Sequence, residues 1–204
     1  MIKAALIMGL IGHILCGVSD CLLGYSKKGR LDLKDINDAD KMHAMFADMP
    51  LSFPLVSMVM GTFAIMLFGF RYIALSHWMS SISAAAANIM FISAMVFLIP
   101  IVTHHVFCGT VEWIYIRLDR KNEVRTAVLE FQKKTICTMF AGYAGLMVFL
   151  ITLFIMTATG KTDIPAWGRI FNTLVFMLLM LPSKLPAKGN IARALMYLGL
   201  IFLI

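Results

Sequence analysis

The sequence predicts an all-α polytopic membrane protein, a transmembrane helical bundle of about six spans. Of its 204 residues, 60% are hydrophobic and only 14% are charged, whereas ordinary globular domains are roughly 45–50% apolar and about 25% charged. The apolar residues gather in long segments, and the Lys and Arg residues gather between them. No polar block of the size of a soluble domain interrupts this pattern, so residues 1–204 are predicted to form one integral membrane domain.

The apolar segments have the length of membrane-spanning helices, which need about 20 mostly apolar residues. The first begins with Met-Ile-Lys, like a signal peptide, but its apolar run extends to Leu23 and no small-residue cleavage pattern precedes Cys16 or Cys21. It is therefore predicted to be a retained first helix. The last two segments are short, which fits a small tilt or a thin stretch of bilayer. The predicted spans are residues 2–24, 51–75, 81–117, 135–158, 166–182 and 190–204.

The third segment, residues 81–117, is too long for a simple crossing. Pro100 lies in its middle and removes a backbone hydrogen bond, so a kink is predicted there. Its last part, residues 108–118, is predicted to emerge along the membrane interface, with Trp113 and Tyr115 at the level of the lipid headgroups.

The distribution of basic residues predicts the orientation of the chain. Six spans place residues 25–50, 118–134 and 183–189 on one side of the membrane, and most of the 18 Lys and Arg residues lie in or beside these loops. Because cytoplasmic loops carry the excess of Lys and Arg, the three loops are predicted to be cytoplasmic, with both termini outside the plasma membrane. Orientation and contact with anionic membrane lipids account for the net charge of +7, and no nucleic-acid partner is predicted.

The first of these loops contains an amphipathic pattern. Met42, Met45, Phe46 and Met49 recur at helical spacing before Pro50 ends the run, which predicts a short helix. Such a helix could lie flat on the cytoplasmic interface of the membrane. The alternative is a lid over a cavity that opens to the cytoplasm.

The motif His-x-x-Cys-Gly occurs twice, in residues 12–17 and 104–109, and an acid follows three residues after each glycine. Residues at i, i+3, i+4 and i+7 share one face of a helix, so each copy draws a polar stripe. If the first and third spans pack together where their glycines allow a close approach, the two stripes form one buried cluster. Chance, an old duplication and repeated use of one packing device all remain explanations of the repeat. The candidate site residues are His13, Asp20, His105 and Glu112.

Ionisable side chains inside a membrane span are costly and usually mark a functional site. A half-buried carboxylate and a half-buried imidazole can have matched proton affinities, which suits acid–base catalysis or a proton relay. A cavity inside a helical bundle could admit a lipid-like molecule from the bilayer. The main hypothesis is therefore binding of, or acid–base chemistry on, a small amphiphilic or lipidic molecule.

Other functions stay open at this point. A helix broken at Pro100 and intramembrane acids also fit a small proton-coupled transporter, which at this length would need to form a homo-oligomer. A metal- or haem-binding protein and a purely structural membrane protein are further alternatives, although no cofactor is predicted and the four cysteines are expected to be free, packed thiols. The residues of a Cys₂His₂ metal set would be His13, Cys16, His105 and Cys108.

Short motifs in the first half of the chain resemble an uncharacterised family of bacterial multi-pass membrane proteins. They are GVSDCLLGYSKKG at 17–29, ADMPLSFPLVSMVMG at 47–61 and HHVFCGTVEWIYIRL at 104–118. The resemblance covers roughly residues 10–118 and implies about six spans in a bacterial inner membrane, with no known activity. It singles out Asp20, Tyr25, Pro50 and His105 as positions to test.

Overall fold

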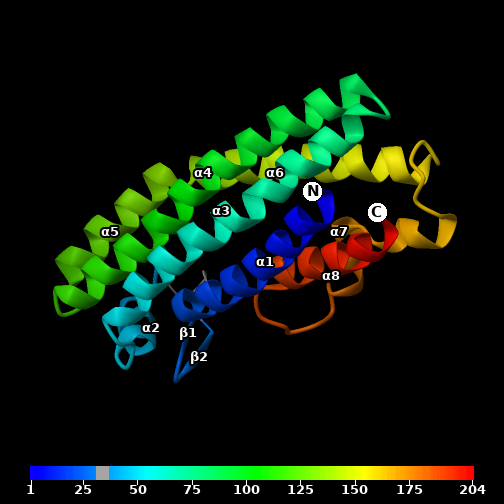
Figure 1. Ribbon diagram of the computed structural model, residues 1–204. Helices are drawn as coiled ribbons and strands as arrows, with labels where there is room; N and C mark the ends of the chain where they lie inside the picture. Colours follow the sequence, from blue (N-terminus) through cyan, green and yellow to red (C-terminus); the bar gives the residue numbers. More distant parts are fainter. Residues whose placement is uncertain (31–36) are drawn as a thin grey trace.

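The computed structural model describes residues 1–30 and 37–204, which are predominantly helical (Figure 1). The longer helices are α1 (Ile2–Gly24), α3 (Ser52–Ser80), α4 (Ala84–Arg117), α5 (Asn122–Thr135), α6 (Cys137–Ala158) and α8 (Lys188–Leu203). The shorter elements are α2 (Ala39–Phe46), the 3-10 helix η1 (Ala166–Ile170), α7 (Thr173–Leu179) and the antiparallel strands β1 (Tyr25–Ser26) and β2 (Gly29–Arg30).

Four helical segments are long and apolar enough to cross a membrane, namely α1, α3, α4 and the joined pair α5 and α6. This confirms the predicted all-α class and is consistent with a membrane protein. The count of six spans is not confirmed, because residues 166–182 hold only η1 and the 7-residue α7. At 1.5 Å per residue α7 is about 10 Å long, far short of a hydrocarbon core about 30 Å thick. Helix α8 has 16 residues and also falls below the usual length of a span.

Pro100 lies inside α4, within the predicted span 81–117. One predicted boundary differs from the structure. Residues 118–134, predicted as a loop, contain α5, which is separated from α6 only by Ile136. The many charged residues of this segment suggested a loop, but Val128 and Leu129 form a buried stripe on one face, so it is an amphipathic helix.

The long helices pack side by side in the order α1, α3, α4, α6, and α8 lies along α1 (Figure 1). A direct packing of the first and third spans, α1 and α4, is therefore corrected: α3 lies between them, and they touch at few points. Ser83 opens α4 by accepting a hydrogen bond from the backbone N–H of Ala86, which makes the connection from α3 to α4 a tight turn. Figure 1 places both chain ends at one end of the bundle, with α2 and α5 at the other.

Glycines set the closest helix contacts. A Cβ added to Gly12 of α1 would lie 2.7 Å from the carbonyl oxygen of Ala64 and 2.8 Å from the backbone nitrogen of Phe68, both in α3. A Cβ on Gly145 of α6 would lie 2.7 Å from the carbonyl oxygen of Ser93 in α4. Small residues of this kind let membrane helices approach each other closely.

We expect Gly12→Ala to lower the melting temperature of the detergent-purified protein, because the obstructing atoms belong to backbone and cannot turn aside. Overpacking of this kind typically costs roughly 1–3 kcal/mol. Gly24→Ala is the matched control on the same helix, since a Cβ there meets nothing within 4 Å. Equal melting temperatures for the two variants would contradict the close contact between α1 and α3.

The end of α4 and helix α2 form a second hydrophobic cluster with α5. Met42, Phe46 and Met49 are buried against it, and the Phe46 ring meets the Tyr115 ring edge-on with centroids 5.6 Å apart. The Nε of Arg120 donates a hydrogen bond to the carbonyl oxygen of Phe46 at 2.9 Å. The predicted amphipathic helix is confirmed, but its apolar face covers protein and not lipid. Tyr115 is likewise buried in protein.

Asp38 starts α2, because its side chain accepts hydrogen bonds from the backbone N–H groups of Asp40 and Lys41. The preceding part of the predicted loop, residues 31–36 with Lys34, lies outside the described residues.

Candidate functional site

Three of the predicted site residues lie in one chain of polar contacts, joined by a residue of α8. The Nδ1 of His13 lies 2.8 Å from the Oδ1 of Asn190, and the Nδ2 of Asn190 donates to the Oδ2 of Asp20 at 2.7 Å. The Oδ1 of Asp20 lies 3.7 Å from the Nδ1 of His105. Side chains of α1, α8 and α4 thus meet at a single carboxylate.

The chain of contacts ends at two serines. The Nε2 of His105 lies 3.0 Å from the Oγ of Ser19 and 3.1 Å from the carbonyl oxygen of Ser57. Each serine hydroxyl also donates to the carbonyl oxygen of the other serine at 2.9 Å, which ties α1 to α3. We call these six residues the polar relay: His13, Asn190, Asp20, His105, Ser19 and Ser57.

A glycine of α3 opens the path by which α4 reaches α1. A Cβ on Gly61 would overlap the imidazole of His105, which occupies the gap left by the missing side chain. The glycines of the two motifs have other neighbours. Gly17 faces Asn190 of α8 in ordinary contact, and Gly109 faces Met58 of α3.

The donors and acceptors around His105 assign its protons. Both serine hydroxyls donate their hydrogen bonds to carbonyl oxygens, so the Nε2 of His105 must itself donate to the oxygens that surround it. In a neutral imidazole the Nδ1 is then an acceptor, and it faces a carboxylate oxygen that is also an acceptor. The contact is favourable only when one further proton lies on His105 or on Asp20. We propose that one proton lies on either partner of the Asp20–His105 pair, and we call it the shared proton; at 3.7 Å the two atoms lie too far apart for a direct hydrogen bond.

The same matching of donors to acceptors orients the side chains of Asn190 and His13 in the polar relay. The carboxylate of Asp20 only accepts, so the amide nitrogen of Asn190 donates to it and the amide oxygen faces His13. The Nδ1 of His13 is then the donor. Its ring stacks on the rings of Phe68 and Tyr197, with centroids 4.4 and 5.8 Å apart. Asn190 consequently links His13 to Asp20, and Asp20 in turn contacts His105.

A polar pocket opens at Asp20. Its volume is about 340 Å³, and Arg30 from the first loop and Lys188 from the last loop line it together with Asn190 and Arg193. The side chain of Asp20 is 41% exposed, whereas that of His105 is 9% exposed. The carboxylate thus faces the pocket while its histidine partner stays inside the bundle.

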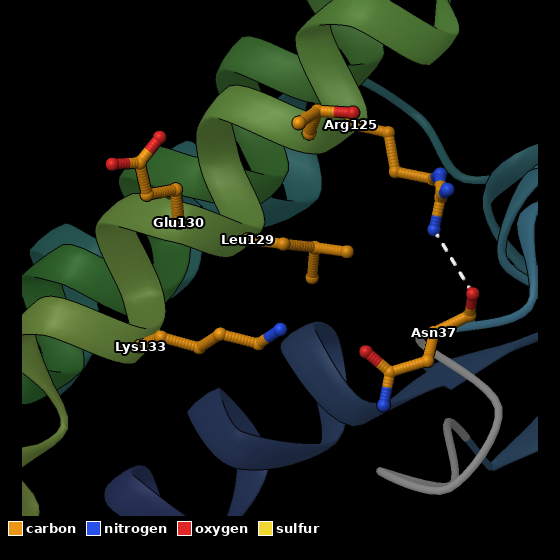
Figure 2. A pocket seen from close by; sticks show the side chains of 6 residues that line it. Asn37, Arg125, Leu129, Glu130 and Lys133 are labelled. Atoms are coloured by element: carbon orange, nitrogen blue, oxygen red, sulfur yellow. Dashed lines mark hydrogen bonds between the residues drawn. The ribbon is translucent and has the colours of Figure 1, made fainter.

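A second pocket, of about 410 Å³, lies between α5 and Asn37. Figure 2 shows Arg125 and Lys133 directed from α5 toward Asn37, while Glu130 points away. A nitrogen of the Arg125 guanidinium donates to the carbonyl oxygen of Asn37 at 3.1 Å, which fastens the first loop to α5. The polar relay does not reach this pocket.

A buried arginine lies behind the polar relay. Arg71 of α3 has no exposed surface, and its guanidinium carbon lies 3.7 Å from the ring centroid of Tyr197 and 4.2 Å from that of Tyr72. Its Nε and one terminal nitrogen have no hydrogen-bond partner within residues 1–30 and 37–204, and the same holds for the hydroxyls of both tyrosines. The aromatic faces stabilise this buried cation.

The other predicted residues do not join the polar relay. Glu112 lies two helical turns beyond His105, and its Oε2 is buried without a hydrogen-bond partner in the described part of the chain. The four residues of the Cys₂His₂ alternative do not converge, and among the described residues no three His, Cys, Asp or Glu side chains gather where they could hold one metal ion. Cys108 instead contacts His104 of its own helix, at 3.5 Å.

Ser19, His105 and Asp20 follow the order of a catalytic triad, with serine at Nε2 and acid at Nδ1. Ser19, however, has no exposed surface and its hydroxyl is committed to Ser57. A nucleophile must reach its substrate, so Ser19 is not placed to attack a carbonyl carbon.

Sequence reasoning missed Asn190, the two serines and the burial of Arg71. The rule that found Asp20 could have found Asn190 and Arg71 as well, because each is a strongly polar residue within an apolar segment. Serines in membrane helices usually bond to their own helix, so Ser19 and Ser57 carried no comparable signal.

The comparisons place the chain in a family without supplying an activity. No curated protein matches the chain, and no solved structure matches it. A family model described as a family of unknown function (DUF6796) matches residues 1–203. The chain therefore belongs to this family of unknown function.

Proposed function

We propose that this integral membrane protein binds a small amphiphilic molecule in the pocket at Asp20 and acts on it by acid–base chemistry through the Asp20–His105 pair. The observation that carries the proposal is the position of one carboxylate. Asp20 faces a polar pocket on one side, and on the other its Oδ1 lies 3.7 Å from the Nδ1 of a buried histidine. A positioned acid–base group of this kind typically accelerates a reaction by about 10²–10⁴-fold.

The setting of the pocket supports an amphiphilic ligand. Tyr143 of α6 and Leu185 line the pocket and are 48% and 45% exposed. Outside the pocket, Phe140 and Leu181 are more than half exposed, as expected of side chains that face lipid. A ligand could thus place its polar head beside Asp20 and its apolar part in the bilayer.

The proposal includes a topology of six membrane crossings. Both termini would lie outside a bacterial plasma membrane, and the three basic loops would lie on its cytoplasmic side. The fifth crossing would be discontinuous, formed by η1, α7 and the irregular residues 180–182. Two observations support it: both chain ends lie at one end of the bundle (Figure 1), and the first and last basic loops meet at one pocket through Arg30 and Lys188. Irregular backbone within a membrane must be covered by protein or line a cavity.

A proton-coupled transporter is the second candidate, and the discontinuous segment before α8 favours it. Broken helices at the level of a binding site are a recurring feature of secondary transporters. In that case the polar relay would carry the coupling proton, and the small chain would work as a homo-oligomer.

The test reconstitutes the purified protein in liposomes made from a bacterial lipid extract. An enzyme is expected to convert a lipid species that mass spectrometry identifies, whereas a transporter is expected to move protons when a substrate gradient is imposed. In either case we expect His105→Gln to lower the rate by about 10²–10⁴-fold, because glutamine can replace the hydrogen bond to Ser57 but cannot exchange a proton.

His77→Gln is the matched control, since His77 lies on the exposed face at the end of α3. Equal rates for His105→Gln and the unmodified protein would exclude the acid–base role. Lipid conversion without proton movement would exclude the transporter.

A further inference from the structure

We infer that the pocket at Asp20 selects ligands with an anionic headgroup, a phosphate or a carboxylate. This inference rests on the proposed function, because it names the class of amphiphile that the same pocket takes. It follows from the charges that line the pocket and from one buried arginine, Arg193, in its wall.

The lining carries more positive than negative charge. Arg30, Lys188 and Arg193 contribute three cations, and Asp20 is the acid among the described residues of the lining. The three cations come from β2 and α8, so two segments far apart in the sequence supply positive charge to one cavity. Fixed positive charges around a concave site raise the local concentration of anions.

Arg193 separates this pocket from an ordinary basic surface. Its side chain is 8% exposed, and its Nε donates to the carbonyl oxygen of Gly189 in the preceding turn of α8 at 2.8 Å. That bond fixes the orientation of the guanidinium of a residue that lines the pocket, and charge-assisted hydrogen bonds from a guanidinium are the usual way in which proteins bind phosphate and carboxylate. Exposed lysines near a membrane attract anionic lipids in general, but they do not require a buried and oriented arginine.

The shared proton of the Asp20–His105 pair explains how a pocket that contains a carboxylate could bind an anion. A carboxylate in the same pocket would repel an anion if it were always charged. Because the pair holds a proton, Asp20 can accept that proton and become neutral when an anionic group approaches. Binding of the anion and protonation of Asp20 then favour each other, as linked equilibria must.

The size of the pocket sets the part of the ligand that it holds. A volume of about 340 Å³ lies near the lower end of the roughly 300–1,000 Å³ typical of pockets for drug-sized ligands, so the pocket has room for a headgroup but not for a whole lipid. The apolar part of a lipid would remain outside, along the exposed side chains near Leu185. The same anionic chemistry could also come from free phosphate in the cytoplasm.

The experiment uses the protein in nanodiscs of phosphatidylcholine with a minor fraction of phosphatidylglycerol, and native mass spectrometry counts the lipids that remain bound. We expect phosphatidylglycerol to be enriched over phosphatidylcholine. Arg193→Gln should reduce that enrichment about tenfold, the loss expected for one charge-assisted contact. Arg193→Lys keeps the charge but loses the fork of the guanidinium, and should give an intermediate value.

Lys184→Gln is the charge-matched control, because Lys184 lies in the loop before α8 but does not line the pocket. An equal loss of enrichment in Lys184→Gln and Arg193→Gln would overturn the inference in favour of general surface attraction. If Arg193→Gln does not fold, the substitutions Arg30→Gln and Lys188→Gln, at an exposed and a half-buried position of the same lining, must lower the enrichment together, and an unchanged value overturns the inference. Inorganic phosphate added to phosphatidylcholine nanodiscs, followed by equilibrium dialysis, distinguishes the sources: binding that depends on Arg193 without lipid enrichment identifies a free anion.

The failure of this inference differs from the failure of the proposed function. Retention of amphiphiles without preference for charge would overturn only the anionic class. If an anion binds but His105→Gln changes neither turnover nor flux, the anionic site stands and the acid–base role is excluded.

Discussion

Asp20→Asn is expected to lower the proposed acid–base activity by about 10²–10⁴-fold while the helices stay packed. Asparagine has the shape of aspartate, and its amide oxygen can still accept the hydrogen bond from Asn190. Its amide nitrogen would donate to the Nδ1 of His105, where the native protein holds the shared proton. The variant therefore keeps the contacts of the polar relay and loses its mobile proton.

The ring nitrogens of His105 report this change directly. In nitrogen-15 spectra of the reconstituted protein, we expect the native Nδ1 to share a proton with Asp20, and the Nδ1 of Asp20→Asn to be an unprotonated acceptor. With 5 histidines in the chain, His105→Gln identifies the signal by its disappearance. Asp163→Asn removes one charge from an exposed turn after α6 and should change neither spectrum nor activity. A protonated Nδ1 in Asp20→Asn would contradict the assignment of the shared proton.

The long helices could be predicted from the sequence because each is a continuous apolar run. The predicted start of the first span at residue 2 and its end at residue 24 coincide with α1. Residues 135–158 agree with α6 to within two residues. The length of an apolar run does not predict a span where a helix cap interrupts the run. Residues 166–182 are apolar enough for one helix, yet Asn172 caps a new helix in their middle by accepting a hydrogen bond from the N–H of Leu174.

The packing order could not be predicted in the same way. The two His-x-x-Cys-Gly stripes suggested that α1 and α4 touch, and the sequence held no sign that α3 would lie between them. His13, Asp20 and His105 nevertheless lie in one polar relay, because an imidazole can cross the gap at Gly61 and the Asn190 amide can bridge the rest. Stripes of polar residues thus predicted which side chains turn inward, but not which helix each one faces.

Glu112 illustrates the limit of helical spacing. It occupies the place in the second stripe that Asp20 occupies in the first, but it follows His105 by seven residues, about 10 Å along α4. Asp20 reaches His105 from another helix, so the acid that the histidine finds is the one from the first stripe. The repeat therefore supplied one histidine–acid pair made of both copies.

Gly61→Ala is expected to disable the polar relay as strongly as His105→Gln does, at a smaller cost in stability than Gly12→Ala. The added methyl group would occupy the place of the His105 imidazole, which must then leave Ser19, Ser57 and Asp20. The obstacle at Gly61 is the end of a side chain that can rotate away, whereas the obstacle at Gly12 is backbone. Gly69→Ala on the same helix is the matched control, since its Cβ would meet only Leu98 methyl groups at 3.5 and 3.6 Å.

A double-mutant cycle separates the loss of the site from a general disturbance of α3. In a His105→Ala background the gap at Gly61 is empty, so Gly61→Ala should cost little or even fill a cavity. Residues in direct contact typically show interaction energies of about 0.5–3 kcal/mol, and we expect a coupling in that range from the thermal unfolding of the four proteins. Additive effects would mean that the imidazole does not occupy the gap, and α4 would then have no route through α3 to the acid on α1.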